Sequence, residues 1–222
     1  NELLRYLPDR LHRSLHAMFV AMWITGETPE TWKRSQTVML YKKGDPANPA
    51  NYRPIGLALT AYKLWTGLVT EVLSGFAESS GVLCDSQEGF RRRRSTQRQL
   101  ANLLNALEDA QHYRRNIYCT FIDLSNAFDS LDHDKLLQLM WDQGFPAHAV
   151  EVVRGLYLGA TTTIMTSFGE SSPIDIERGT LQGDSLSPFL FLLFIDPLLR
   201  WLHVGGRGYR HGCLTDVAAQ ER

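Results

Sequence analysis

The sequence predicts an α+β fold, in which helices pack on a sheet of short strands. Apolar residues recur every three or four positions in several segments, which is typical of amphipathic helices. Shorter runs rich in β-branched and aromatic residues lie between these segments and predict strands. The 222 residues are 44% hydrophobic, which is enough to fill the core of one domain or of two small subdomains.

Helices are predicted wherever the helical spacing persists, namely over residues 3–22, 60–77, 96–113, 133–142, 149–157 and 189–202. Gly26 stands where the first helix would end, and Asp132 or His133 can cap the fourth. Thr96, with Gln99 three residues on, predicts a capping box at the start of the third. Strands are predicted over residues 35–41, 118–122, 161–168 and 174–176, with a hairpin through 169–173 joining the last two.

One acidic residue stands at the end of a predicted strand. The apolar run Tyr118–Ile122 stops at Asp123 and continues through small polar residues towards the helix at 133–142. A carboxylate in this place projects beyond the strand end, where open sheets bind ligands, and its oxygens suit Mg²⁺. A cap on the turn or on the following helix would use the same residue, and both interpretations stay open at this point.

The formal net charge of the chain is only −1, so the chain as a whole lacks the excess positive charge that a nucleic-acid-binding protein often carries. The basic residues instead gather in two local groups. One group contains Lys33, Arg34, Lys42, Lys43 and Arg53, and the other contains Arg91, Arg92, Arg93, Arg94 and Arg98. Lysines at a strand end, with an arginine across a turn, would suit a polyphosphate. The arginine run just before a helix N-terminus would also suit an anion. Solvated charged faces are the alternative for both groups.

A glycine-containing loop precedes the last apolar helix. Gln182 lies between Gly179 and Gly183, where backbone can approach a ligand closely and the amide can donate and accept hydrogen bonds. A generic turn before a helix would look the same.

The three cysteines Cys84, Cys119 and Cys213 follow no metal-ligand or disulfide spacing, which favours an intracellular location. No signal peptide and no membrane span of about 20 apolar residues is recognised, so no membrane partner is expected. The longest apolar run, 189–195, is predicted to be a buried helix face or strand.

Five motifs follow one another in an order that resembles the reverse transcriptase domain of non-LTR retrotransposons, over residues 32 to 202. They are Lys42-Lys43-Gly44-Asp45, Asn51-Tyr52-Arg53-Pro54-Ile55, Gln87-Glu88-Gly89-Phe90-Arg91, Phe121-Ile122-Asp123 through Ala127-Phe128-Asp129, and Gln182-Gly183-Asp184-Ser185-Leu186-Ser187-Pro188. The resemblance implies a right-hand polymerase fold with fingers and an antiparallel palm sheet. It also implies a division into an N-terminal helical extension (1–31), a fingers-like subdomain (32–117) and a partial palm subdomain (118–222), with the thumb absent.

The same resemblance implies a role for each matching residue. Asp123 would bind a catalytic Mg²⁺ or Mn²⁺ ion together with the backbone carbonyl of Leu124. The incoming dNTP would meet Lys42, Lys43, Arg53, Gln182 and Gly183, with Phe128 excluding a ribose 2′-hydroxyl. The template would pass Gly89, Phe90 and Arg91. Asp129 and Asp184 match the family too, but a capping or salt-bridging part is expected of them.

The reaction implied is RNA-directed DNA synthesis, a nucleotidyl transfer in which a DNA primer 3′-hydroxyl attacks a dNTP on an RNA template with two divalent ions. The family's next motif, two adjacent aspartates, is not found after Gln182, and Asp216 lacks its flanking pattern. We therefore expect a fragment that is inactive alone. The resemblance also implies a nuclear location.

Two other classes of protein are alternatives to an active polymerase domain. A decayed polymerase-like module that binds nucleic acid or protein without catalysis would have the same motifs. A dinucleotide-binding enzyme is disfavoured, because no Gly-x-Gly-x-x-Gly follows a predicted strand.

Overall fold

The structure is a computed structural model that describes residues 5–181, 183–204 and 208–212. Its helices are α2 (Asp9–Thr25), α3 (Thr60–Ser79), α4 (Thr96–His112), α5 (His133–Asp142), α6 (Ala147–Tyr157) and α7 (Leu186–Val204), with short 3-10 turns η1 (Glu30–Trp32) and η2 (Pro49–Asn51). Its strands are β1 (Arg34–Tyr41), β2 (Tyr52–Leu57), β3 (Thr161–Thr166), β4 (Gly169–Glu170) and β5 (Ile174–Asp175).

The helix ends follow local capping chemistry. Asp132 caps α5 by accepting a hydrogen bond from the Lys135 backbone N–H at 3.1 Å, as predicted. The predicted capping box at Thr96 was wrong by one residue. Ser95 has extended backbone, and its hydroxyl accepts the Arg98 N–H at 3.2 Å, so Thr96 is already helical.

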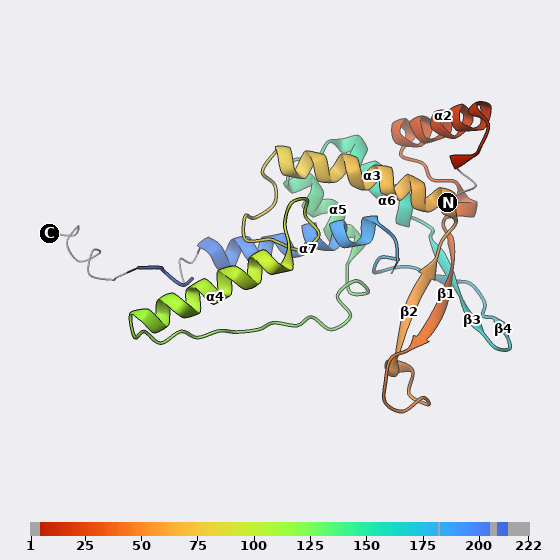
Figure 1. The fold of residues 1–222 in the computed structure, drawn as a ribbon. Coiled ribbons are helices and arrows are strands. Elements are labelled where there is room, and N and C mark those ends of the chain that lie inside the picture. The colour runs from red at the N-terminus through yellow and green to blue at the C-terminus, as the bar shows by residue number, and fades with distance from the viewer. Residues whose placement is uncertain (1–4, 182, 205–207, 213–222) are drawn as a thin grey trace. The chain divides into compact units, whose positions relative to one another are not determined.

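The strands form one mixed sheet in the order β2-β1-β3-β4, with β5 paired to β3 (Figure 1). The β1–β2, β3–β4 and β3–β5 pairs are antiparallel, whereas β1 and β3 are parallel. Helices together with a mixed sheet confirm the predicted α+β class.

The prediction of a strand at 118–122 was wrong. Residues 116–124 have neither helical nor strand structure, and the side chains of Tyr118 and Phe121 are 90% and 84% exposed. A strand is stabilised by hydrogen bonds and side-chain pairs with a neighbour, and no described segment pairs with this one. The antiparallel sheet expected around Asp123 is therefore not formed by the described residues.

The contacts divide the chain into two compact units, Asn1–Val82 with Asn126–Phe194 and Leu83–Ser125 with Ile195–Arg222. The three-part division at 31/32 and 117/118 stays a prediction about the role of each part.

The first unit holds the larger core. Its fully buried side chains include Leu131, Leu136, Met140, Leu156, Leu190 and Leu193, which come from the start of α5 to the first half of α7. The rings of Phe19 on α2 and Trp65 on α3 stack with centroids 5.6 Å apart. This packing fixes the helices that carry the loops described below.

The second unit is organised by a buried carboxylate. Asp196 on α7 is 0% exposed and accepts hydrogen bonds from the Cys84 backbone N–H at 2.7 Å and from Arg200 Nε at 2.6 Å. Just after α4, the guanidinium of Arg115 lies over the rings of Tyr113 and Tyr209 and donates to Oδ2 of Asp109, on α4, at 2.7 Å. These contacts hold the segments that flank α4.

By length and a mean hydropathy of 1.3, α7 could cross a membrane. Leu190, Leu192 and Leu193 are buried in the core of the first unit, which is what the core helix of a folded domain also shows. The absence of a membrane partner stays a prediction.

Candidate functional site

The β1–β2 hairpin brings the predicted phosphate-binding residues onto neighbouring strands. Arg53 lies opposite Leu40 in the antiparallel register, and the Lys42 N–H donates to the Asn51 carbonyl at 2.8 Å. Arg53 is exposed, as are Lys42 and Lys43 just beyond the end of β1. The hairpin thus brings together the cations that the sequence separates by about ten residues.

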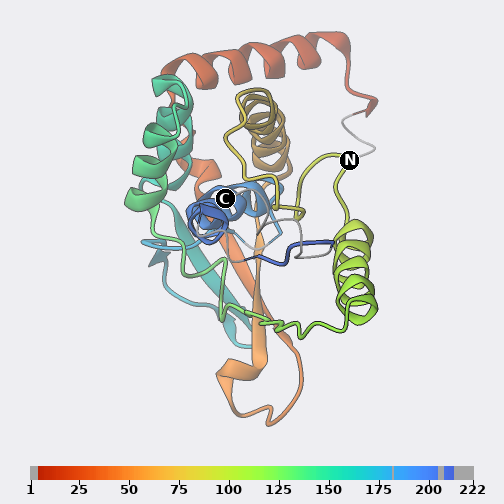
Figure 2. The same cartoon turned by 90° about the vertical axis from the view of Figure 1, so that its left-hand side faces the viewer.

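The loop between the two strands is held by its own hydrogen bonds. Asn51 Nδ2 donates to the Asp45 carbonyl at 2.9 Å, and the Tyr52 hydroxyl donates to the Pro46 carbonyl at 2.9 Å. Gly44 has φ +97°, a conformation that favours glycine, and Figure 2 shows the loop extending past the strands. Because the loop is internally bonded, less conformational entropy is lost when a ligand binds there.

The loop that follows Gln182 lies against β2. Gly183 has φ +104°, and a Cβ on it would lie 3.6 Å from the Gly56 carbonyl oxygen and 3.9 Å from Ile55 Cγ2. Side chains alternate along a strand, so Arg53 leaves β2 on the same face as Ile55. Gln182 itself lies outside the described residues.

Phe128 lies in the turn before α5. This turn packs on residues 179–180, at the start of the loop that contains Gly183. The Phe128 carbonyl accepts the Thr180 N–H at 3.0 Å, and the Phe128 and Phe191 ring centroids are 5.3 Å apart. A Cβ on Gly179 would lie 2.9 Å from Asp129 Cα, so this approach needs glycine. Contacts of Gly179, Thr180 and Gly183 therefore bring the segment of Phe128 and the face of β2 that carries Arg53 into one region of the first unit.

A buried pair anchors that loop, and sequence reasoning missed one of its members. The Thr66 hydroxyl on α3 donates to Asp184 Oδ1 at 2.5 Å, and both residues are buried. The backbone N–H groups of Ser185 and Leu186 also favour the charged form of the Asp184 carboxyl and oppose the rise of its pKa, and a capping or salt-bridging part for Asp184 stays a prediction. The sequence feature that could have pointed to Thr66 is a polar residue within the apolar stripe of the helix α3.

Asp184 should make the stability of the first unit depend on pH. Burial raises the pKa of the Asp184 carboxyl above its ordinary value, and the hydrogen bond from Thr66 opposes the shift. The folded state then binds the proton more tightly than the unfolded state, so stability falls as pH rises from about 4 through the raised pKa. In Asp184→Asn this loss is expected to be absent, so the stability of the variant relative to the parent rises over that range.

Urea unfolding at several pH values measures this dependence. Glu108→Gln, at an exposed site on α4, is the control and should keep the pH profile of the parent. Parallel profiles for Asp184→Asn and the parent chain would contradict the prediction.

The three predicted template residues lie in the second unit. The Gly89 N–H donates to Gln87 Oε1 at 3.1 Å, and Phe90 is 67% exposed with φ 54°. Arg91 is half-buried, and its Nη1 donates to the Cys84 carbonyl at 2.9 Å. Arg91 therefore shapes this loop, and a template contact by any of the three stays a prediction.

Asp123 and Leu124 also belong to the second unit, and both are exposed. Within the described residues, no group of three or more histidine, cysteine, aspartate or glutamate side chains could hold a metal ion. Two Mg²⁺ ions need more protein oxygens than one carboxylate and one carbonyl supply. The described residues thus do not fit a two-ion centre, and Asp216 lies outside them.

Comparison with known proteins agrees with the motif order. A family model described as reverse transcriptase (RNA-dependent DNA polymerase) matches residues 41–209. The chain is 30% identical over 195 residues to a probable RNA-directed DNA polymerase from transposon BS of Drosophila melanogaster, covering 87% of the chain and 21% of that protein. It is 28% identical over 195 residues to the RNA-directed DNA polymerase from the mobile element jockey of the same species, with coverages of 87% and 21%.

A third relative is the Pol polyprotein from a type-1 retrotransposable element R2 of Popillia japonica, which is 29% identical over 177 residues, covering 79% of the chain and 24% of that protein. The chain thus spans about a fifth to a quarter of the length of these relatives. Because the family model covers more than half of its residues, the chain belongs to the reverse transcriptase family of RNA-dependent DNA polymerases.

Proposed function

We propose that the chain supplies the nucleotide-binding part of an RNA-directed DNA polymerase that adds dNTPs to a DNA primer on an RNA template. The observation that carries this proposal is the β1–β2 hairpin, which places Arg53 beside the end of β1 that bears Lys42 and Lys43. The Gly183 loop lies against the same strand. Family membership supplies the reaction class.

Each residue then has a chemical role. The Arg53 guanidinium can bind two phosphate oxygens as a fork, and the two lysines add point charges. Phe128, whose carbonyl holds the loop at Thr180, would place its ring against the sugar and disfavour a 2′-hydroxyl. Gln182 and Gly183 would line the pocket, and Gly89, Phe90 and Arg91 would contact the template. A right-hand arrangement of fingers and palm, without a thumb in this chain, is part of the proposal.

A divalent ion, Mg²⁺ or Mn²⁺, would add positive charge at the dNTP phosphates when bound. The motif resemblance names the Asp123 carboxylate and the Leu124 carbonyl as the candidates to hold one. The transfer step itself therefore depends on further oxygen ligands, and we assign the described residues to binding and positioning. Action on DNA in the nucleus is proposed from the family alone.

Arg53→Gln tests triphosphate binding. We expect the affinity for a fluorescent 2′-deoxynucleoside triphosphate to fall by roughly tenfold or more, since charge-assisted hydrogen bonds contribute about 1.5–3 kcal/mol. Equilibrium titration of the 222-residue chain measures it. The matched control is Arg34→Gln, an exposed arginine at the opposite end of β1, which should change affinity little. Equal losses in both variants would mean that the hairpin binds the nucleotide only through net charge.

Primer extension on an RNA template separates the enzyme from a binding module without catalysis. We expect the polypeptide of the complete open reading frame to incorporate dNTPs and the 222-residue chain alone to incorporate none. Nucleotide binding without incorporation by the complete polypeptide would favour the module.

A further inference from the structure

We propose that the first unit binds a basic, lysine- and arginine-containing segment of a partner protein in a groove beside β5. The groove, called here the acidic groove, consists of two adjoining cavities of about 490 and 390 Å³ that share residues 175–177. None of the described residues assigned above to the nucleotide, the template or the metal lines either cavity.

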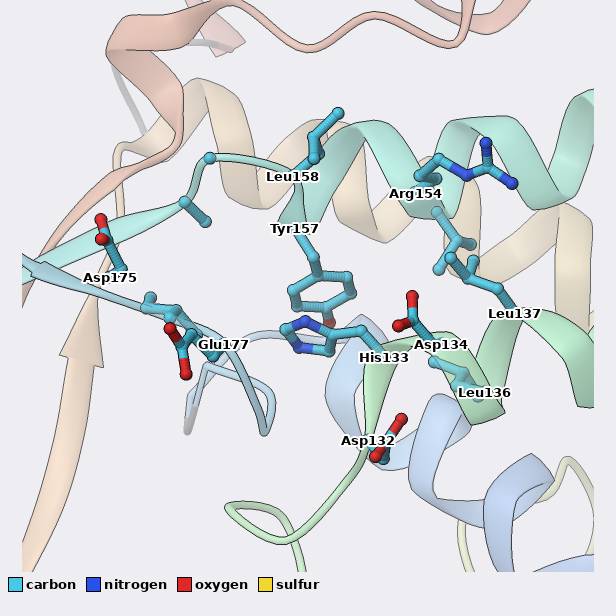
Figure 3. A pocket seen from close by; sticks show the side chains of 14 residues that line it. Asp132, His133, Asp134, Leu136, Leu137, Arg154, Tyr157, Leu158, Asp175 and Glu177 are labelled. Carbon is cyan, nitrogen blue, oxygen red and sulfur yellow. The ribbon is translucent and has the colours of Figure 1, made fainter.

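The first cavity combines an aromatic floor with carboxylates on both sides (Figure 3). The rings of His133 and Tyr157 stack with centroids 4.5 Å apart, and His133 Nε2 is 2.7 Å from the Gly179 carbonyl, which fixes the imidazole. Asp175 and Glu177 stand on one side of these rings, and Asp134 stands on the other. Apolar side chains from α5 and α6 complete the floor. A lysine or arginine side chain, which carries its positive charge at the end of an apolar stem, matches this lining.

The negative charge of this cavity is largely uncompensated. The side-chain carboxylates of Asp134, Asp175 and Glu177 make no hydrogen bond or ion pair within the described residues. Of the described residues that line it, Arg154 is the one arginine, and its Nη2 is 3.4 Å from Glu151 Oε1 in an ion pair of its own. Carboxylates without protein partners attract cations from solution and repel anions.

The second cavity continues the groove along residues of β1, β2 and β3. The hydroxyls of Thr37 and Thr162 are bonded to each other at 2.8 Å. Thr180 also lines this cavity, is only 6% exposed, and its hydroxyl has no hydrogen-bond partner in the part of the chain that the structure describes. A buried hydroxyl without a partner is costly, and an N–H donor from a ligand would relieve that cost once the side chain turns toward the cavity.

These features favour a basic peptide over other ligands. Nucleic-acid phosphates would face Asp175 and Glu177, and no group of metal-ligating side chains exists among the described residues. The methylene stems of lysine and arginine can cover the apolar floor, and a guanidinium can lie over the Tyr157 and His133 rings. Two cavities in a row suit an extended segment better than a single small cation.

The acidic groove shares residues 179–181 with the loop of the proposed nucleotide site, but it lies on the face of β2 that Arg53 does not use. Pro54 and Gly56 line its second cavity, and side chains alternate along β2, so Arg53 leaves the strand on the other face. A protein partner could therefore bind while the hairpin holds a nucleotide.

Fluorescence polarisation with a labelled hexapeptide of alternating alanine and basic residues, at about 0.15 M salt, tests the proposal. We expect the double variant Asp175→Asn/Glu177→Gln to weaken binding by about five- to tenfold, the combined effect of two partly exposed ion pairs. Asp9→Asn/Glu108→Gln, with the same change of charge at exposed sites on α2 and α4, should leave binding within about twofold of the parent.

Three outcomes would overturn the proposal. They are equal weakening by both double variants, no weakening by either, and displacement of the peptide from the groove by an RNA hexamer. Both substitutions are isosteric and lie on exposed side chains, so the fold should persist. Ala160 lines the first cavity, and peptide binding should shift its NMR signal.

Discussion

Replacing Gly155 with alanine is expected to destabilise the first unit by about 3 kcal/mol, the upper part of the range for overpacking. Gly155 lies on α6 where the helix meets the end of α2, and a Cβ there would lie 1.9 Å from the Gly26 carbonyl oxygen. Gly26 ends α2 in the left-handed conformation, with φ +71°, and would itself lie close to Glu151 with any side chain. Neither backbone can move away without disturbing a helix, so the clash cannot be relieved cheaply.

Urea unfolding followed by tryptophan fluorescence measures this effect, since Trp23, Trp32 and Trp65 lie in the first unit. The matched control is Gly75→Ala in the middle of α3, where a Cβ would meet nothing within 4 Å. That change should stabilise the helix by about 0.5–1 kcal/mol because alanine has the higher helix propensity. Similar shifts of the same sign in both variants would show that α2 and α6 do not meet in this way.

Asp196→Ala is expected to destabilise the second unit by about 3 kcal/mol. The carboxylate is 0% exposed, and its two oxygens accept from Cys84 and Arg200 at 2.7 and 2.6 Å. Its removal would leave the buried Cys84 N–H without an acceptor. Hydrogen exchange of the Cys84 amide is the specific measurement, and we expect it to become at least tenfold faster.

Two comparisons make this result specific. Asp196→Asn keeps an oxygen for Cys84 and should lose less stability than the alanine variant. Glu30→Ala removes an ion pair with Lys33 at 2.9 Å, but the Glu30 side chain is 75% exposed, so the loss of stability should be much smaller than that of Asp196→Ala. If Cys84 exchange were unchanged in Asp196→Ala, the buried acceptor would not be Asp196.

Local sequence predicted the elements whose stability is local. The end of α2 at Gly26 and the cap of α5 at Asp132 depend on backbone conformation and on a hydrogen bond over three residues. The spacing of apolar residues likewise predicted α3 and α6 to within two residues at each end. By contrast, the run at 118–122 has strand composition without a strand, because its state depends on a neighbour that composition does not reveal.

By itself, the sequence determined the family, through five motifs in order, and it named the residues that we propose bind phosphate and sugar. Only the tertiary structure decided that β1 and β3 run parallel, that Thr66 anchors the loop at Asp184, and that acidic residues from α5 and from the segment after β3 line one groove. The physical reason is distance along the chain. Caps and periodicity act over a few residues, whereas Thr66 and Asp184 are 118 residues apart and meet only when the core has packed.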